Sequence, residues 1–298
     1  MRPQLSVILI SILITTAIAA ATPGDVLVTS SASAAGDHFG TSLCGRTTTW
    51  TVGSPAAGGL HGAGKTQTIN AATGLATNPT KTGQTLDDSF GYSVDCQNDN
   101  FLVGAYWWND PSNIRTGHAY LFGPTGTLIK TLDDPDPNNN DHFGRSVAFS
   151  NTRIIVGEPG YHYTKKVKGT TVDVEIGKIH IYDLSGNAQL EMQNPNLDGL
   201  AFGEWATAHG DRALVSTLDT ISGVDRAGSV LLIDTTNGAV LHTFLPPTPT
   251  YTGFFGAGLT MDDRNIVIGE LNGISGGTAG GAAYLYDATT YALITTIP

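Results

Sequence analysis

The sequence predicts an all-β protein built from five copies of one repeat. A Phe-Gly pair recurs five times, starting at Phe39, Phe90, Phe143, Phe202 and Phe255, so that successive copies lie 51, 53, 59 and 53 residues apart. From each of these glycines it is 13 positions to a small residue that closes a short apolar stretch: Gly53, Gly104, Gly157, Ser216 and Gly269. No long helical pattern follows the first twenty residues. A period near fifty residues made of short strands indicates an array whose units bury their faces against their neighbours.

The start of the chain has the pattern of a secretory signal peptide. Residues 1–21 contain Arg2, an apolar stretch from Ser6 to Ala20, and small residues that suit cleavage. The alternative is a membrane anchor, but the apolar stretch is shorter than the ~20 residues that a membrane span needs. We therefore predict export with cleavage, no membrane span in the mature chain, and a secreted, extracellular or cell-surface location, with the periplasm as another compartment that fits.

Each repeat begins with two apolar strands around a polar turn. In the third copy, the strand near Val147 is followed by the turn Ser150–Thr152 and by Ile154–Val156. Unbroken runs of β-branched and aromatic residues such as Ile154–Val156 are typical of strands that are covered on both faces. The turn residues predict hairpin connections.

The second half of each repeat predicts two more strands. The third strands are expected at 117–122, 177–183, 228–234 and 281–287, and fourth strands follow short turns, as at 127–132. Four strands per repeat make the blade of a β-propeller, so residues 22–298 are predicted to form one propeller domain. In the first repeat, the outer half (Lys65 to Thr85) is poorly patterned.

The N-terminal stretch Val26 to Ser30 matches the fourth strands of the later repeats. If five blades close a ring, this strand is expected to pair with the fifth blade and fasten the ends together. The sequence is equally compatible with a propeller that continues in a longer protein.

The repeats resemble a known family. Asp141–Ala148 followed by Val156–Pro159, and Ser89–Val94 followed by Val103–Ala105, resemble the FG-GAP repeat, which forms the blades of integrin α-subunit propellers and of many secreted bacterial proteins. The fourth copy is degenerate, with Gly203–Ala208 and Ser216 in place of the usual motif. The resemblance implies a β-propeller and a binding or adhesion module, although a fold does not by itself fix an activity.

Many members of this family carry a calcium loop of the type D-x-D-x-D-G in the first hairpin of a blade. The corresponding hairpins here, such as Gly45–Thr49 and Asp262–Asn265, do not place carboxylates at alternate positions. Because Ca²⁺ needs several oxygen ligands, no calcium is predicted in these hairpins, and no metal ligand or cofactor is assigned. The acidic segment Asp133–Asp141 is either a cation site or an ordinary connector rich in turns.

Composition and motifs favour binding over catalysis. The formal net charge is −11, which argues against nucleic acid as a partner. No H-E-x-x-H or G-x-S-x-G motif is present. The alternative function is a quinoprotein-like propeller enzyme, since Asp234–Gly238 and Asp287–Thr290 are similar to the D-x-x-T-G turn of those proteins. The tryptophan that usually follows this turn is replaced by Leu241–Phe244 and Leu293–Thr296.

Variation between the repeats is greatest in the loop between the second and third strands. This loop is longest in the second and third copies, at 105–116 and 158–176. We predict that it forms a binding surface for an extracellular protein or glycan, because exposed aromatic residues are enriched at such surfaces. The other interpretation is that its aromatic residues cap a neighbouring blade. The candidate binding residues are Trp107, Trp108, Asp110, Tyr161 and Tyr163.

The chain has two cysteines, Cys44 and Cys96, and disulfides can form in an exported protein. Aligned on the Phe-Gly pair, they occupy adjacent columns, so that they point to opposite faces of their blades. Opposite faces are what successive blades present to each other. The two sulfur atoms are expected either to form a disulfide near the axis or to remain as free buried thiols, because packed sheets lie ~10 Å apart.

Overall fold

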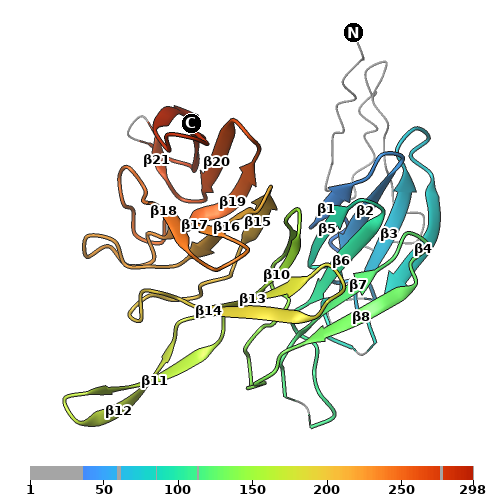
Figure 1. Ribbon diagram of the computed structural model, residues 1–298, viewed down its shortest axis with the longest axis horizontal. Coiled ribbons are helices and arrows are strands. Elements are labelled where there is room, and N and C mark those ends of the chain that lie inside the picture. The colour runs from blue at the N-terminus through green and yellow to red at the C-terminus, as the bar shows by residue number, and fades with distance from the viewer. Residues whose placement is uncertain (1–35, 59–61, 85, 113, 276–277, 298) are drawn as a thin grey trace.

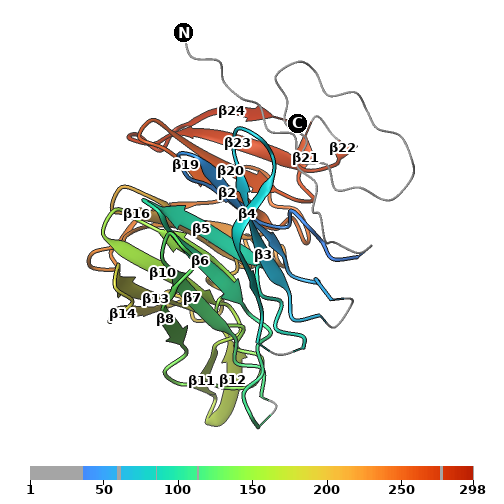
Figure 2. The ribbon, with the colours of Figure 1, turned by 90° about the vertical axis from the view of Figure 1, so that its right-hand side faces the viewer.

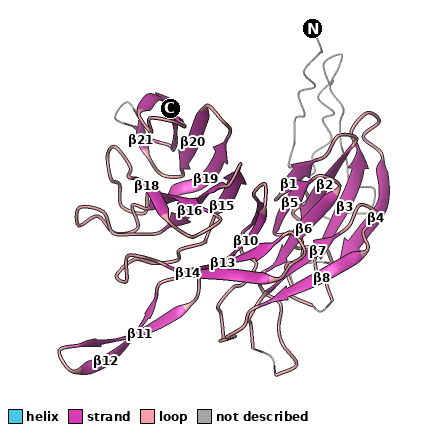
Figure 3. Cartoon of the chain, in the orientation of Figure 1, coloured by secondary structure: helices cyan, strands magenta, loops and turns pink. Residues whose placement is uncertain are grey.

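The computed structural model describes residues 36–297 except 59–61, 85, 113 and 276–277. The predicted signal peptide (residues 1–21) and the predicted strand Val26 to Ser30 lie outside the described residues. All regular structure in the described part of the chain is β-strand, as Figure 3 shows. No helix there is long and apolar enough to cross a membrane. The predicted all-β class is therefore confirmed.

The strands form five antiparallel four-stranded sheets, which are the five predicted blades. Blade 1 contains β1 (Leu43–Gly45), β2 (Thr49–Ser54), β3 (Lys65–Asn70) and β4 (Ala76–Thr82). Blade 2 contains β5 (Ser93–Gln97), β6 (Asn100–Ala105), β7 (His118–Phe122) and β8 (Leu128–Asp133). Blade 3 contains β9 (Val147–Phe149), β10 (Arg153–Glu158), β13 (Lys178–Asp183) and β14 (Ala188–Gln193). Blade 4 contains β15 (Ala206–His209), β16 (Arg212–Thr217), β17 (Ser229–Asp234) and β18 (Val240–Phe244). Blade 5 contains β19 (Phe255–Met261), β20 (Asn265–Glu270), β23 (Ala282–Asp287) and β24 (Leu293–Ile297).

The blades follow one another around an arc that has blades 1 and 5 at its ends (Figures 1 and 2). Along this arc the innermost strands contact each other in the order β1, β5, β9, β15 and β19. In blade 5, β20 alternates between buried and half-buried residues, whereas the equivalent strands β6, β10 and β16 are buried along nearly their whole length. The face of blade 5 that carries Val267 and Leu285 is thus covered less completely than the equivalent faces of blades 2 to 4.

Apolar side chains from successive blades interdigitate and form the core. Leu102 and Leu121 of blade 2, for example, belong to one buried cluster with Ile154 and Val156 of blade 3. Equivalent clusters lie between blades 3 and 4 and between blades 4 and 5. The phenylalanines of the Phe-Gly pairs in blades 3 to 5 are buried in these clusters, and Phe90 is buried in a further cluster of blade 2; at most 2% of each remains exposed. The main stabilising contribution therefore comes from burial between blades.

The repeated glycines are explained by a close backbone contact between blades. Gly144 follows Phe143 with φ +85, a conformation that favours glycine. Its carbonyl oxygen accepts a hydrogen bond from Ser93 Oγ of blade 2 at 3.0 Å. A Cβ atom added to Gly104 of blade 2 would lie 2.0 Å from the same oxygen. The Phe-Gly pair and the closing small residue are thus two sides of one joint between blades.

Blade 4 departs from this joint, as its degenerate sequence suggested. Ser216 stands where the other blades have glycine, and its Oγ accepts the Trp205 N–H at 2.9 Å. A Cβ atom on Gly256 of blade 5 would lie 2.9 Å from Ser216 Cβ. Strand β19 has a register shift between Phe255 and Gly258. The larger residue in blade 4 therefore coincides with a bulged first strand in blade 5.

Cys44 and Cys96 form a disulfide between blades 1 and 2 with a Cα–Cα distance of 5.5 Å. Cys44 lies on β1 and Cys96 on β5, two strands that contact each other near the axis. The spacing of about 10 Å between packed sheets is not an obstacle here, because the blades converge towards the axis and bring the two strands together.

The long loop of blade 3 contains a hairpin that the sequence pattern did not predict. Strands β11 (His162–Val167) and β12 (Thr170–Glu175) form a two-stranded ribbon that projects away from the blades at the lower left of Figure 1. A shorter ribbon, β21 (Ile274–Ser275) with β22 (Thr278–Ala279), occurs in the equivalent loop of blade 5.

Candidate functional site

The loops between second and third strands share one face of the molecule with the connectors that enter each blade; we call this the loop face. Each such loop is held by a backbone hydrogen bond to the connector of its own blade. The Trp107 N–H donates to the Asp88 carbonyl at 3.3 Å, and the Gly160 N–H donates to the Asp141 carbonyl at 2.9 Å. The rigid blades therefore fix where both long loops begin.

The two tryptophans of the blade 2 loop have different environments. Trp107 is half-buried, and the Arg115 guanidinium lies 5.0 Å from its ring. Trp108 stacks on His118 of β7 with 3.6 Å between ring centroids and packs against the apolar cluster of blade 2. Both side chains are half-buried, but Trp108 covers the end of its own blade, whereas Trp107 packs against Tyr106 and Arg115 in the loop region.

Asp110 shapes the loop in which it lies. Its Oδ1 accepts the N–H groups of Ser112 and Ile114, each at 2.8 Å. Such side-chain bonds to the following backbone stabilise a turn. They leave Oδ2 of Asp110 as the oxygen that could meet a partner.

The two tyrosines lie at the base and on the stem of the ribbon. The Tyr161 hydroxyl accepts a hydrogen bond from Gln193 Nε2 at 3.1 Å, and Lys178 Nζ lies 4.1 Å from the centre of its ring. Tyr163 lies on β11 opposite Val174. Within the described part of the chain, no ring contact joins these tyrosines to Trp107 or Trp108, so the five candidate residues make two separate groups, one for each loop.

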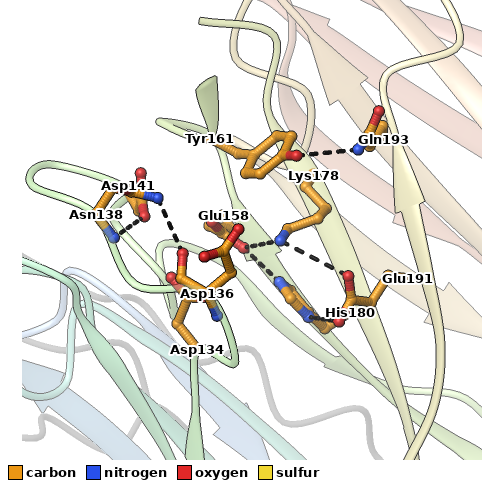
Figure 4. A network of polar contacts seen from close by, with 10 residues as sticks. All are labelled: Asp134, Asp136, Asn138, Asp141, Glu158, Tyr161, Lys178, His180, Glu191 and Gln193. Atoms are coloured by element: carbon orange, nitrogen blue, oxygen red, sulfur yellow. Dashed lines mark hydrogen bonds and ion pairs between the residues drawn. The ribbon is translucent and has the colours of Figure 1, made fainter. Parts of the chain in front are cut away.

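A cluster of ionisable side chains lies near the base of the ribbon. It includes Asp134 from the acidic segment Asp133–Asp141, for which the sequence left a cation site and a connector open, together with Glu158 and His180, which were not predicted as site residues. Asp134 from the connector after β8, Glu158 from the end of β10, and His180 from β13 each offer a ligand atom, and these atoms all lie within 4.8 Å of one another (Figure 4). All three residues are buried. His180 Nε2 shares a short hydrogen bond with Glu158 Oε2, and Lys178 Nζ lies 3.4 Å from the same oxygen.

Burial changes the protonation of this cluster. Burial raises the pKa of Glu158 to about 9, and the charge of Asp134 adds to this effect. Burial and the Lys178 ammonium lower the pKa of His180 to about 4. Burial therefore disfavours charge on both Glu158 and His180.

Several carboxyl oxygen atoms in and beside the cluster receive no N–H group. Within the described residues, Glu158 Oε1 is buried and has no partner. Asp134 Oδ2 and Asp141 Oδ1 are also buried and receive no N–H group, although the Asp134 and Asp141 carboxyls lie within hydrogen-bonding reach of each other. Buried polar atoms are nearly always satisfied, so Glu158 Oε1 requires an explanation. Carboxylate oxygens beside an imidazole are a donor set that divalent metal ions use. The cluster is thus the part of the described structure best suited to hold a metal ion.

This cluster is hidden in the sequence because its members come from a connector and from two strands. A comparison of equivalent positions in the repeats could have revealed it. At the position of Glu158, blade 2 has Ala105 and blade 4 has Thr217; at the position of His180, blade 2 has Tyr120 and blade 4 has Leu231. Blade 3 therefore differs from its neighbours at two positions that lie on adjacent strands.

The turns that suggested a quinoprotein-like enzyme have a local explanation. Asp234 Oδ1 accepts the Thr236 N–H at 2.8 Å, and Asp287 Oδ1 accepts the Thr290 N–H at 2.7 Å. These bonds within the turns lower the pKa of both carboxyls. The aspartates are therefore accounted for as residues that stabilise the turns between third and fourth strands.

Comparison with known families supports the interpretation of the repeats. Residues 84–122 and 127–170 match the family model of the FG-GAP repeat. A comparison with curated proteins finds no significant match. The matched segments cover blade 2 and the first half of blade 3, and the other blades repeat the same four-stranded plan. The protein is accordingly a five-bladed β-propeller that contains FG-GAP repeats.

Proposed function

We propose that the protein is an exported, non-enzymatic binding module that uses the long loops of blades 2 and 3 to bind an extracellular protein or glycan. The observation that carries the proposal is the β11–β12 ribbon, which projects from a rigid blade at the loop face (Figure 1). A rigid scaffold that presents variable loops is a common arrangement for recognition.

The ribbon offers its surface to a partner. Nine of the twelve residues of β11 and β12 are exposed, including the apolar Val167 and Val172, and Tyr163 is half-buried. A two-stranded ribbon is only marginally stable by itself. Here the outer part of β11 is tied to the connector that follows β14, because Lys165 Nζ forms an ion pair with Asp198 and donates a hydrogen bond to the Leu197 carbonyl at 3.0 Å. A partner would therefore meet an extended element that is already held in place.

The blade 2 loop supplies the aromatic part of the proposed surface. Trp107, with the Arg115 guanidinium over its ring, combines a flat apolar face with a cation. Tryptophan and arginine are the residues most often found at the energetic centres of interfaces. Trp107 is thus the residue expected to contribute most to binding. Asp110, Tyr161 and Tyr163 complete the proposed site, and Trp108 supports the loop by packing on His118.

The test measures binding of the purified protein to a glycan array and to a panel of immobilised extracellular-matrix glycoproteins. For any probe that binds the wild type, Trp107→Ala is expected to weaken binding at least tenfold, which corresponds to about 1.4 kcal/mol. Replacing residues 162–175 by a short glycine linker should weaken it as well. Thr125→Ala, an exposed change in the turn between β7 and β8, is the control and should bind like the wild type.

The outcome of these variants decides the proposal. If the Trp107→Ala variant and the ribbon deletion both fold and bind as well as the wild type, the binding site lies elsewhere. Trp108→Ala is a poor test of binding, because Trp108 packs on His118 and its loss would disturb the blade. Export is tested separately by expressing the full chain and sequencing the N-terminus of the secreted product, which should begin at residue 22.

A further inference from the structure

The cluster of Asp134, Glu158 and His180 leads to an inference that is independent of the proposed binding surface. Its members are held by elements that cannot easily move apart: Glu158 ends β10, and β10 pairs with β13, which carries His180, over six residue pairs. Asp134 immediately follows β8 of the preceding blade, in a connector where the Asp136 N–H donates to Asp134 Oδ1 at 2.9 Å. The ligand atoms are therefore positioned before any ion arrives.

Charge is not balanced at this place. Glu158 and Asp141 are fully buried, and Asp134 is 8% exposed. The one ammonium group among them is that of Lys178, which is shared between Glu158 at 3.4 Å and Glu191 at 3.7 Å. Buried carboxylates are stable when they are paired or when they coordinate a metal ion. A single lysine cannot pair with all of these carboxyls, so the cluster can accept further positive charge.

Two of the carboxyl groups that could coordinate a metal ion carry oxygen atoms without an N–H partner. Asp134 Oδ2 and Glu158 Oε1 receive no N–H group, although both are buried. Figure 4 shows Asp134 and Glu158 converging on His180, with Asp141 on the connector side of the group. Ligand atoms around a tetrahedral zinc ion lie about 3–3.5 Å apart, given metal–ligand distances near 2 Å. The three ligand atoms, all within 4.8 Å of one another, need only small adjustments to reach this spacing.

The surroundings of His180 also suit a metal ligand. Its Nε2 faces Glu158, while its Nδ1 lies 3.6 Å from Glu191 Oε1. Metal-binding histidines commonly direct their second ring nitrogen to a carboxylate, which fixes the ring and strengthens the ligand. Glu191 is in a position to do this for His180.

From this geometry we propose that blade 3 binds one divalent transition-metal ion, Zn²⁺ or Mn²⁺, through Asp134, Glu158 and His180. The mixed set of carboxylates and one imidazole favours these ions over Ca²⁺ and Mg²⁺, which prefer oxygen ligands alone. The site lies between the connector from blade 2 and the strands of blade 3, so the ion would fasten the two blades at the loop face.

Blade 5 provides a matched control. Glu270 occupies the position equivalent to Glu158 and is also buried, but both of its oxygens have partners. Its Oε1 accepts the Thr250 hydroxyl at 2.8 Å and its Oε2 accepts the Tyr284 hydroxyl at 2.6 Å. Tyr284 stands where blade 3 has His180. Glu270→Gln therefore changes the same kind of residue at the same depth without touching the proposed ligands.

The experiment treats the purified full chain with a chelator and titrates it with Zn²⁺, Mn²⁺, Ca²⁺ and Mg²⁺ by isothermal calorimetry. The wild type is expected to bind one Zn²⁺ or Mn²⁺ per chain. Glu158→Gln and His180→Phe should weaken this binding at least about a hundredfold, and Glu191→Gln should weaken it about tenfold. Glu270→Gln should bind like the wild type.

A measurement on the wild type alone keeps the proposal testable if the variants do not fold. X-ray absorption of the Zn²⁺-loaded protein should show a single imidazole among ligands that are otherwise oxygen. The proposal is overturned if the wild type binds neither ion stoichiometrically, if the spectrum shows no imidazole, or if Glu158→Gln and Glu270→Gln bind with equal affinity.

Discussion

At the scale of single residues, blades 1 and 2 are joined by a covalent bond. The disulfide between Cys44 and Cys96 closes a loop across a sequence separation of 52 residues. Next to it, Asp95 is half-buried between blades 2 and 3, where its oxygens accept the N–H groups of Cys96 at 2.7 Å and Phe149 at 2.6 Å. Two neighbouring residues of β5 thus hold this blade to its two neighbours.

The disulfide predicts both a chemical and a thermodynamic result. Titration of unreduced, denatured protein should find no free thiol, since no cysteine in the described chain is unpaired. The Cys44→Ser/Cys96→Ser variant should unfold more easily by about 2–4 kcal/mol, because the unfolded chain is less constrained without the cross-link. Chemical denaturation of the two proteins measures this difference. Two free thiols in the wild type would disprove the bond.

Asp95 predicts a specific dependence of stability on pH. Burial raises its pKa from 3.8 to about 6, in spite of the two backbone N–H groups that favour the ionised form. The folded state therefore binds more protons than the unfolded state between these two values. This proton contributes stability that is fully present below pH 3.8 and is lost as the pH rises through about 6.

The Asp95→Asn variant removes this contribution. The free energy of unfolding of the wild type should fall by about 2–3 kcal/mol relative to that of the variant between about pH 4 and pH 7. The variant has a lower stability overall, because its amide nitrogen cannot accept the Phe149 N–H, so only the two slopes are compared. Denaturation curves at several pH values that run parallel for both proteins would contradict the assignment.

At the scale of elements, the blades are uniform and the inserted ribbon is not. Strands β10 and β13 pair regularly over their whole length, although the loop between them contains the β11–β12 ribbon. The blade needs no side chain from the ribbon for its own core, since Tyr163 and Val172 lie outside the buried clusters. An insertion at this place costs the fold little. The strands and the core of blade 3 thus do not depend on the sequence of the β11–β12 ribbon.

At the scale of the whole molecule, the small residue that ends the second strand of blades 1 to 4 lies in close contact with the following blade. A Cβ atom on Gly157 would lie 2.0 Å from the Gly203 carbonyl oxygen of blade 4. On Gly269 of blade 5, the nearest atom to a Cβ is the Gly258 nitrogen of the same blade, at 3.4 Å. The described blades therefore form an open arc that ends at blade 5.

This difference predicts unequal effects of the same substitution. Gly157→Ala should destabilise the protein by about 1–3 kcal/mol or more, since two backbones must separate to admit the methyl group. Gly269→Ala should change stability by about 0.5 kcal/mol or less, as expected of a substitution without steric conflict. The midpoints of thermal unfolding measure both. An equal loss in the two variants would show that another sheet covers blade 5 in solution.

The sequence by itself determined the repeat, the four-stranded blades and the positions of the joints. Each contact between blades has room only for a small residue, and this residue recurs at a fixed number of positions after each Phe-Gly pair. Such a regular spacing can be recognised from the sequence alone. The sequence also narrowed the fate of Cys44 and Cys96 to two alternatives. Only the tertiary structure decided between them, because the distance between blades depends on how far they converge towards the axis.

The tertiary structure alone also assembled the cluster of Asp134, Glu158 and His180. The sequence marks Asp134 only as part of the acidic segment Asp133–Asp141, and nothing along the chain links it to Glu158 and His180. The three residues meet because the connector after β8 reaches the end of β10, which pairs with β13. The same is true of Trp107 and Trp108, which are identical and adjacent in sequence. Packing on His118 assigns Trp108 to the blade, whereas Trp107 packs in the loop region. Local sequence patterns determine the strands, whereas the packing of the strands and loops determines which side chains lie close together.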